Sequence, residues 1–424
     1  MSTLAAPPAS APTPLRQDAA VIGLVGIAHL ISHYSQLLLA PLFPWLKTEF
    51  AVSYTELGFL LTVFFVVSCV VQAVSGFAVD RFGPRPILFA GLGLLGLAAV
   101  GYASSQSYWM LAACAVVAGI GNGVFHPVDY TLINRKVGKA RLGHAYSVHG
   151  ITGSLGWALA PAMLVPLAVA FSWRVALLCA AALIFGVLAL LLLNRGQLSL
   201  PAAPQAGPAP AAGAAAAPAS TEGPFDFLKI PAVWMCFGFF FFYAISLSVV
   251  QSFAPEAARQ LHAVPVHLVA MCLTIYMVCS SGGMVVGGFL ASDPARSERV
   301  VGLAFGTAAA LALVVGLSRV PSMAVPVLFG AMGFFAGIAG PSRDLLVKRS
   351  SPENATGRVY GVVYAGLDIG QALSPLFFGA LMDRHHYVGV WIGLAVVQGV
   401  LIVSAFNVRR VRRTSKAIGT PVQA

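Results

Sequence analysis

The chain has 424 residues, of which 58% are hydrophobic and only 9% are charged. Soluble globular domains contain about 45–50% apolar and about 25% charged residues, so this composition excludes a water-soluble globular protein. The formal net charge is +11, and its meaning depends on where the few charged residues fall along the chain.

Apolar segments of membrane-spanning length recur along the chain. A helix needs about 20 mainly apolar residues to cross a hydrocarbon layer roughly 30 Å thick. We therefore predict an all-α membrane protein with twelve transmembrane helices, at residues 20–44, 55–79, 86–104, 108–132, 143–170, 173–193, 231–253, 266–291, 299–318, 323–347, 358–382 and 388–407.

The distribution of Lys and Arg predicts the orientation in the membrane. Cytoplasmic loops carry an excess of these residues. If the N-terminus is inside, most basic residues between the spans become cytoplasmic, as does the basic cluster at 409–416. We therefore expect a multi-pass protein of the cell inner (plasma) membrane with both termini cytoplasmic. Arginines next to a membrane bind anionic lipid, so we expect the lipid bilayer, and no nucleic acid, as the partner of this charge.

A segment rich in Ala, Pro, Gly and Ser lies between the sixth and seventh predicted spans, from Gln197 to Gly223. Such a composition is typical of a linker that forms no core. We predict five regions: a disordered cytoplasmic N-terminus (1–19), an N-terminal six-helix bundle (20–195), a cytoplasmic linker (196–228), a C-terminal six-helix bundle (229–408) and a basic cytoplasmic tail (409–424).

The two halves resemble each other in sequence. Residues 119–161 align without a gap on residues 333–375, a shift of 214 positions (333 − 119). Identical pairs include Gly119/Gly333, Gly123/Gly337, Pro127/Pro341, Tyr146/Tyr360 and Gly156/Gly370, and the same shift pairs Ala40-Pro41 with Ala254-Pro255. Because six is an even number, the chain returns to its starting side after the first half, and both halves cross the membrane in the same direction. We therefore predict two pseudo-symmetric bundles related by an axis along the membrane normal. In transporters built this way the substrate site lies between the repeats, near the middle of the bilayer.

The segment GFAVDRFGPR, which begins at Gly76, lies between the second and third predicted spans. It resembles the GxxxDRxGRR loop of the major facilitator superfamily, with Pro84 in place of the first basic residue of the final pair. The segments ISHYSQLLLAPLFPWLKTEFAVSYTELG and VFHPVD resemble fosmidomycin-resistance-type and related efflux carriers of that superfamily. The resemblance implies alternating access, with a conformational-switch motif formed here by Gly76, Asp80, Arg81, Gly83 and Arg85.

Ionisable residues inside a membrane are costly, at roughly 2.5–3.5 kcal/mol each, so they are functional candidates. In the first span His29 and His33 lie four residues apart and share a helix face, with Gln36 about one turn further on. We interpret these three residues as part of a substrate cavity. The alternative is a pair of neutral histidines that bond to neighbouring helices.

The fourth span carries Asn122, His126 and Asp129 at helical spacing, and Pro127 can kink the helix there. We predict that His126 and Asp129 take part in proton coupling and that Asn122 lines the substrate cavity. The alternative is a structural ion pair of Asp129 with Arg81, Arg85 or Arg343.

The eleventh span carries the acidic residue that lies farthest from any predicted membrane edge, Asp368. Tyr364 and Gln371 lie near it at helical spacing. We interpret Asp368 as the main proton carrier, with a hydrogen-bonded packing role as the alternative. The other predicted cavity residues are Tyr364, Gln371, His149, Trp157, Tyr243 and Arg343.

The sequence contains no phosphate-binding loop of the Walker type, no nucleophile–base–acid set and no metal-ligand spacing among its cysteines. We therefore expect no enzyme activity, no cofactor and no metal site. Our interpretation is a monomeric secondary active transporter that exports a small organic compound or drug, anionic ones included, in exchange for protons. The alternative is proton-coupled uptake of an organic acid or another small metabolite.

The predicted topology can be tested by labelling single introduced cysteines in intact cells. Cysteines placed in residues 200–220 and 409–424 are expected to react only after the membrane is opened, because both segments should be cytoplasmic. A cysteine at Arg319, in a predicted outer loop, should react in intact cells and serves as the control. Labelling of either cytoplasmic segment from outside would contradict the topology.

Overall fold

The computed structural model describes residues 15–200, 231–290, 297–350 and 356–418. These residues contain no strand, and twelve helical spans among them are long and apolar enough to cross a membrane. Each predicted span overlaps one of these twelve, so the predicted fold class is confirmed. The helices are α1 (Leu15–Gln36), α2 (Phe43–Phe50), α3 (Tyr54–Phe82), α4 (Pro84–Ser104), α5 (Tyr108–Asn122), α6 (Phe125–Lys136), α7 (Leu142–Ala170), α8 (Trp173–Leu193), α9 (Pro231–Ser252), α10 (Ala254–His262), α11 (Val266–Leu290), α12 (Ser297–Leu317), α13 (Val325–Ser350), α14 (Thr356–Asp383) and α15 (Tyr387–Ile418).

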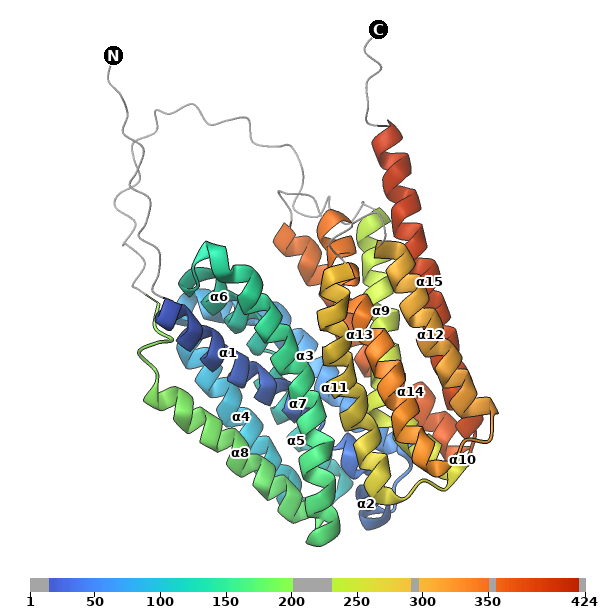
Figure 1. The fold of residues 1–424 in the computed structure, drawn as a ribbon. Helices are drawn as coiled ribbons and strands as arrows, with labels where there is room; N and C mark the ends of the chain where they lie inside the picture. Colours follow the sequence, from blue (N-terminus) through green and yellow to red (C-terminus); the bar gives the residue numbers. More distant parts are fainter. Residues whose placement is uncertain (1–14, 201–230, 291–296, 351–355, 419–424) are drawn as a thin grey trace, which may run out of the picture.

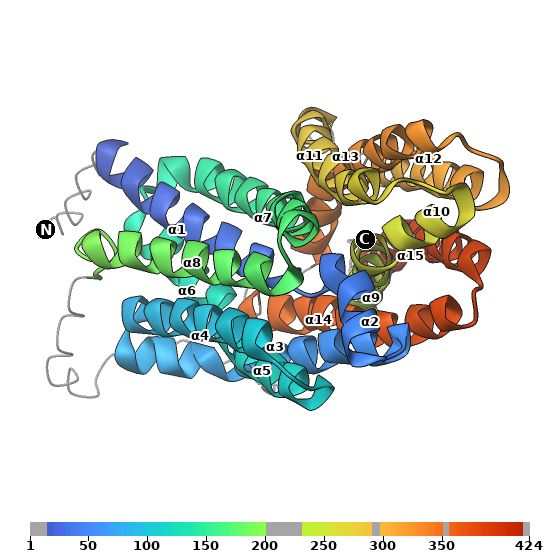
Figure 2. The ribbon, with the colours of Figure 1, turned by 90° about the horizontal axis from the view of Figure 1, so that it is seen from below.

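The helices form two groups that lie side by side (Figures 1 and 2). Helices α1–α8 make the N-terminal half and α9–α15 the C-terminal half, and the halves meet mainly where α3 lies along α14 and α7 along α11. The start of α1 and the end of α15 lie at one end of the molecule, the upper end in Figure 1. We call this the terminal end, and the opposite end, where α2 and α10 lie, the distal end.

Glycines that are identical in the two halves lie where helix backbones approach most closely. A Cβ atom on any of these glycines would collide with a backbone carbonyl oxygen of the neighbouring helix. Small residues permit such close contacts between membrane helices, so the repeated glycines are explained by packing. The pairs of glycine and carbonyl are Gly119 with Phe64, Gly123 with Ser68 and Gly156 with Leu30, and in the other half Gly333 with Tyr276, Gly337 with Ser280 and Gly370 with Phe241.

The fourth span is interrupted between α5 and α6. Pro127 has no N–H and its ring clashes with the carbonyl of the residue four positions earlier, which is Gly123. The helix breaks at Gly123 and Val124, and the Gly123 carbonyl accepts a hydrogen bond from Ser75 Oγ at 3.4 Å. The expected distortion is therefore present, but it precedes the proline. Asn122 consequently ends one helix while His126 and Asp129 lie in the next, so these residues do not form one continuous helical face.

The repeated Ala-Pro pairs mark where the first and seventh spans turn into the short helices α2 and α10. Pro255 occupies the first turn of α10, where a missing N–H costs nothing. Both short helices end at an alanine in the left-handed region, Ala51 with φ of 52° and Ala263 with φ of 50°. The internal repeat therefore extends to the distal end of both halves.

The packing role of the repeated glycines can be tested with a matched pair of alanine variants. In Gly119→Ala the new Cβ would lie 2.6 Å from the Phe64 carbonyl oxygen, whereas a Cβ at Gly93 in α4 meets nothing within 4 Å. Overpacking costs about 1–3 kcal/mol, which exceeds the roughly 1 kcal/mol that replacing a helical glycine gains. Gly119→Ala should therefore lower the thermal unfolding temperature in detergent and Gly93→Ala should not. Equal melting temperatures for the two variants would refute this explanation.

Candidate functional site

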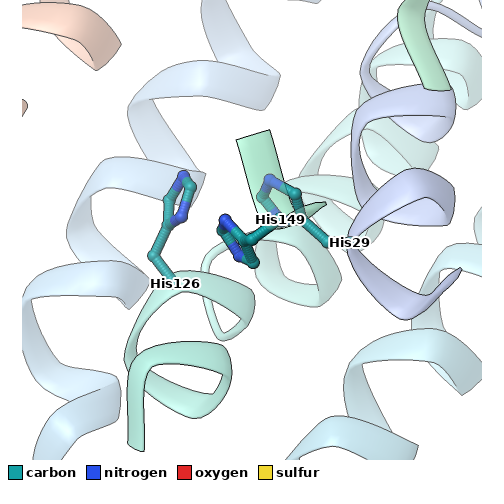
Figure 3. Close-up of side chains that lie close together, drawn as sticks. All are labelled: His29, His126 and His149. Carbon is teal, nitrogen blue, oxygen red and sulfur yellow. The ribbon is translucent and has the colours of Figure 1, made fainter. Parts of the chain in front are cut away.

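Three histidines and one aspartate from three helices meet inside the N-terminal half. His29 lies on α1, His126 on α6 and His149 on α7, and Figure 3 shows their side chains reaching into one space. Asp129, one turn after His126, places Oδ2 3.1 Å from His149 Nε2 and 3.2 Å from His29 Nδ1. We call these four residues the histidine cluster. The structure thus brings His29 and His149 to the pair of His126 and Asp129, which the sequence analysis had placed on a different span.

The close contact of α1 with α7 brings the rings together. The His29 and His149 rings stack with centroids 3.5 Å apart, and the His29 and His33 centroids are 4.3 Å apart. A Cβ at Gly153 on α7 would lie 2.7 Å from the His33 ring and 3.0 Å from His29 Nε2. A glycine at this position therefore makes room for both rings on the face of α7.

Hydrogen bonds link the remaining predicted residues of this half into a chain beside the histidine cluster. Trp157 Nε1 donates to Gln36 Oε1 at 2.9 Å, and the Trp157 ring stacks on His33 at 4.2 Å between centroids. Gln36 Nε2 and Ser32 Oγ both donate to Asn122 Oδ1, at 3.3 and 2.8 Å. Asn122 thus connects α1 with α5 and, through its 2.9 Å bond to Ser68 Oγ, with α3.

Burial separates the cluster into an inner and an outer part. His29, Asp129 and His149 are 2%, 0% and 5% exposed, whereas His126, like Gln36 and Trp157, is partly exposed. The described partners of Asp129 are histidines and not the arginines that the alternative interpretation named. The side chain of Arg343, one of those arginines, lies outside the described residues.

Asp368 lies apart from the histidine cluster, at the contact between the halves. Its Oδ2 accepts a 3.1 Å hydrogen bond from Gln72 Nε2 on α3, and Cys69 of the same helix lies beside the carboxyl group. Gln371 donates to Gln251 at 3.4 Å within the C-terminal half. The predicted polar residues therefore divide into a group within one half and a smaller group that reaches across both. Tyr243 packs against Phe305 with centroids 6.4 Å apart, and the side chain of Tyr364 lies outside the described residues.

The motif of the α3–α4 connection lies at the terminal end. Gly83 separates the two helices with φ of 81°, a conformation that glycine adopts without strain. Asp80 and Arg81 are exposed, and a Cβ at Gly76 or Gly83 would meet nothing within 4 Å. These residues are thus loosely packed in this conformation.

At the distal end the halves are tied together. The Asp383 carboxylate at the end of α14 accepts hydrogen bonds from the backbone N–H groups of Tyr54 and Thr55, at 2.6 and 2.9 Å, and from Thr55 Oγ1 at 2.6 Å. Lys47 Nζ lies 3.9 Å from the same carboxylate. A negative charge is favoured at the first turn of α3 because the helix dipole is positive there. We call this contact the distal latch.

A cavity of about 490 Å³ lies between the halves at the distal end. Repeat-related residues face it from both halves, Pro41 with Pro255 and Trp45 with Arg259. Its lining contains none of the predicted site residues, so this cavity is separate from the histidine cluster and from Asp368.

The chain has twelve apolar spans in two packed groups, and polar residues gather inside one group and between the two. This arrangement is that of a membrane transporter. The family model described as Major Facilitator Superfamily matches residues 25–325 and 236–423, and the chain belongs to this superfamily.

Individual relatives align over parts of the chain or at low identity. The chain is 30% identical over 142 residues to the uncharacterized MFS-type transporter YfnC of Bacillus subtilis, covering 33% of this chain and 34% of that protein. It is 28% identical over 159 residues to the fosmidomycin resistance protein of Escherichia coli, covering 36% and 37%. These two alignments thus span about a third of each relative. The hexuronate transporter of Bacillus subtilis is 22% identical over 416 residues, which covers 95% of this chain and 96% of that one.

Among solved structures, the chain is similar to a bacterial homolog of the human lysosomal transporter Spinster in an inward-facing and occupied conformation. The TM-score is 0.74 at 14% identity, over 95% of this chain and 98% of that chain. At this identity the likeness shows the fold, and the fold is that of the superfamily.

Several residues of these networks escaped the sequence analysis. These residues are uncharged, whereas the search for functional candidates in the sequence began from ionisable residues. They are Gln72, Gln251, Ser32 and Ser68. The glutamines had a usable signal, because a side chain with two donors and two acceptor sites needs a partner inside a membrane.

The distal latch predicts a conformational shift in Asp383→Asn. Loss of charge-assisted hydrogen bonds, worth roughly 1.5–3 kcal/mol each, should shift the ratio of the two conformations about tenfold or more toward the form that is open at the distal end. Spin labels at Gln106 and Ser318, one exposed position on each half near this end, would report longer distances in a background without native cysteines.

Glu49→Gln provides the control for this experiment. Glu49 binds Arg174 at 3.0 Å, and both residues belong to the N-terminal half. The substitution removes a similar ion pair without crossing between the halves, so the distances should not change. An equal shift in both variants would mean that the latch does not hold the halves together.

Proposed function

We propose that the chain is a proton-coupled exporter of a small organic compound that works by alternating access. The superfamily supports small-molecule transport across a membrane without catalysis by the chain itself. We place the protein in the cell inner membrane as a monomer, with cytoplasmic termini and the five regions predicted from the sequence. The observation that carries proton coupling is the bond between Asp368 and Gln72.

Asp368 suits a proton carrier because its surroundings depend on how the halves are arranged. Its bond to Gln72 and its contact with Cys69 both cross from the C-terminal to the N-terminal half. Alternating access moves one half against the other, so these contacts break when the halves separate at this level. A carboxylate that loses its partners and gains water in one conformation can exchange its proton there. Asp129 and His126 lie within one half, and they are our second candidates for the carrier.

The conformation fits one step of this cycle. With both termini in the cytoplasm, the distal latch closes the outer side while the motif around Asp80 and Gly83 lies loosely packed on the inner side. We infer an inward-facing state. Reversal would break the latch and pack the motif, which gives Gly76, Asp80, Arg81, Gly83 and Arg85 the role of a conformational switch.

Partial exposure supports the assignment of three residues as substrate contacts. Gln36, His126 and Trp157 form the exposed edge of the polar region in the N-terminal half, and Trp157 offers a flat ring with one donor. The buried residues behind them, His29, His33, Asn122 and His149, hold this surface in place. From the other half we assign Tyr243, Arg343, Tyr364 and Gln371 to the same cavity.

The relatives support two directions of transport. Similarity to a fosmidomycin resistance protein favours export of a compound of that kind. The alignment with a hexuronate transporter is weaker in identity but covers nearly the whole chain, and it favours proton-coupled uptake of an organic acid as the second candidate. Fosmidomycin and glucuronate are therefore the first two probes, and the one that the reconstituted protein moves decides between the two functions.

Asp368→Asn tests the carrier. The amide mimics the protonated carboxyl group but releases no proton, so transport driven by a pH gradient should fall to the level of protein-free liposomes. Substrate binding and exchange of labelled for unlabelled substrate should persist, because neither requires proton release. Proteoliposomes with and without a pH gradient, together with a binding assay on purified protein, measure both properties.

The matched control is Glu49→Gln, which also replaces an acid by its amide but removes an ion pair with Arg174 inside the N-terminal half, and it should keep gradient-driven transport. If Asp368→Asn retains gradient-driven transport near the wild-type rate, this residue is not the carrier. The assignment would then pass to Asp129 with His126.

A further inference from the structure

The histidine cluster has the composition of a metal-binding site. His29, His126 and His149 each offer a ring nitrogen, and these three atoms lie within 4.8 Å of one another. The carboxylate of Asp129 approaches two of the same rings. Proton coupling as proposed above uses Asp368 first, so it does not by itself explain why three imidazoles and a carboxylate gather, at a cost, inside one membrane helix bundle.

The distances match the geometry of a tetrahedral metal ion. Zinc binds imidazole nitrogen at about 2.0–2.1 Å and carboxylate oxygen at about 2.0–2.2 Å, so its ligand atoms lie roughly 3.3 Å from one another. Asp129 Oδ2 lies 3.1 Å from His149 Nε2 and 3.2 Å from His29 Nδ1. Both distances are close to the edge length of such a tetrahedron. His126 offers the fourth ligand: its ring centroid lies 5.4 Å from that of His29 and 6.2 Å from that of His149.

The hydrogen bonding of the cluster is incomplete without a further partner. Nδ1 of His126 and Oδ1 of Asp129 are buried and make no hydrogen bond, and Nδ1 of His29 has only its 3.2 Å contact with Asp129 Oδ2, although buried polar atoms in proteins are nearly always paired. Unpaired polar atoms are especially costly in a membrane, where no bulk water can replace the missing partner. A cation bound by the three rings and the Asp129 carboxylate would provide a partner for the ring nitrogens.

We propose that His29, Asp129, His149 and His126 form a binding site for a divalent transition metal ion of the zinc type. Imidazole with one carboxylate favours ions such as Zn²⁺, Co²⁺ and Ni²⁺, whereas Mg²⁺ and Ca²⁺ require oxygen ligands. The ion enters past His126, the only partly exposed member of the cluster, and joins α1, α6 and α7 within the N-terminal half. This site replaces the expectation of no metal that followed from the sequence.

Metal binding is tested on the purified full-length protein in detergent, after removal of any histidine tag and after alkylation of the cysteines. Equilibrium dialysis against Zn²⁺ should give one ion per chain. Co²⁺ should give the intense visible absorption of a four-coordinate site. In His149→Gln and His29→Gln the affinity should fall by more than about 100-fold, which exceeds the roughly 10–100-fold effect of losing an outer-shell partner.

His144→Gln is the matched control, because His144 lies on the same helix as His149 but is exposed. It should bind Zn²⁺ and Co²⁺ like the wild type. His126→Gln, at the exposed edge of the cluster, keeps the test decisive if the inner variants fail to fold, as judged by size-exclusion chromatography and circular dichroism.

Absence of stoichiometric binding in the wild type overturns the proposal, as does binding that persists unchanged in folded His126→Gln and His149→Gln. The assay contains neither transported substrate nor a proton gradient. Its result is therefore independent of whether the protein exports or imports, and of whether Asp368 carries the proton.

Discussion

The close approach of α1 and α7 determines where the polar residues of the N-terminal half can meet. Gly156 lies so near the Leu30 carbonyl that no Cβ fits between them, and Gly153 gives the same space to the rings of His29 and His33. Larger side chains at these two positions would hold the helices apart and separate His149 from His29. The histidine cluster, the stacking of His33 on Trp157 and the hydrogen bond from Trp157 to Gln36 all depend on this contact.

Polar contacts within a half and polar contacts between the halves serve different purposes. A contact inside one helix group, such as Asn122 with Ser32 and Ser68, can persist while the groups move as bodies. Contacts such as Asp368 with Gln72, or Asp383 with the first turn of α3, exist only in the arrangement that brings their helices together. The first kind therefore does not depend on how the two groups are arranged. The second kind makes the stability of one arrangement of the halves depend on a single carboxylate.

The two halves keep the same residues at the close helix crossings, but they differ at the positions of the polar residues. Gly119 and Gly333 occupy equivalent helix crossings, and each faces a carbonyl of the neighbouring helix. The histidine cluster has no equivalent in the other half, because the partner of His126 is Gly340 and that of His149 is Val363. The two halves thus share a scaffold, while the polar residues that could bind an ion belong to one of them.

The sequence alone determined the class of fold, the number of spans, the repeat and the motif of the α3–α4 connection. These follow from local properties, since the hydrophobic length of a helix and the identity of a glycine or proline can be read from consecutive residues. Pro127 likewise predicted a distortion of the fourth span. The distortion lies at Gly123, and this position follows from the rule that a proline disturbs the carbonyl group four residues earlier.

The grouping of the polar residues was decided only by tertiary structure. His29, Asp129 and His149 are separated by 100 and 20 positions (129 − 29 and 149 − 129), and no spacing rule relates residues on different helices. Sequence reasoning therefore selected each of them singly and found no metal-ligand pattern. Gln72 was missed for the same reason, because an uncharged amide gains its significance from Asp368, which lies 296 residues further along the chain. Helix packing is set by many weak contacts summed over whole faces, and only their sum places these side chains within reach of one another.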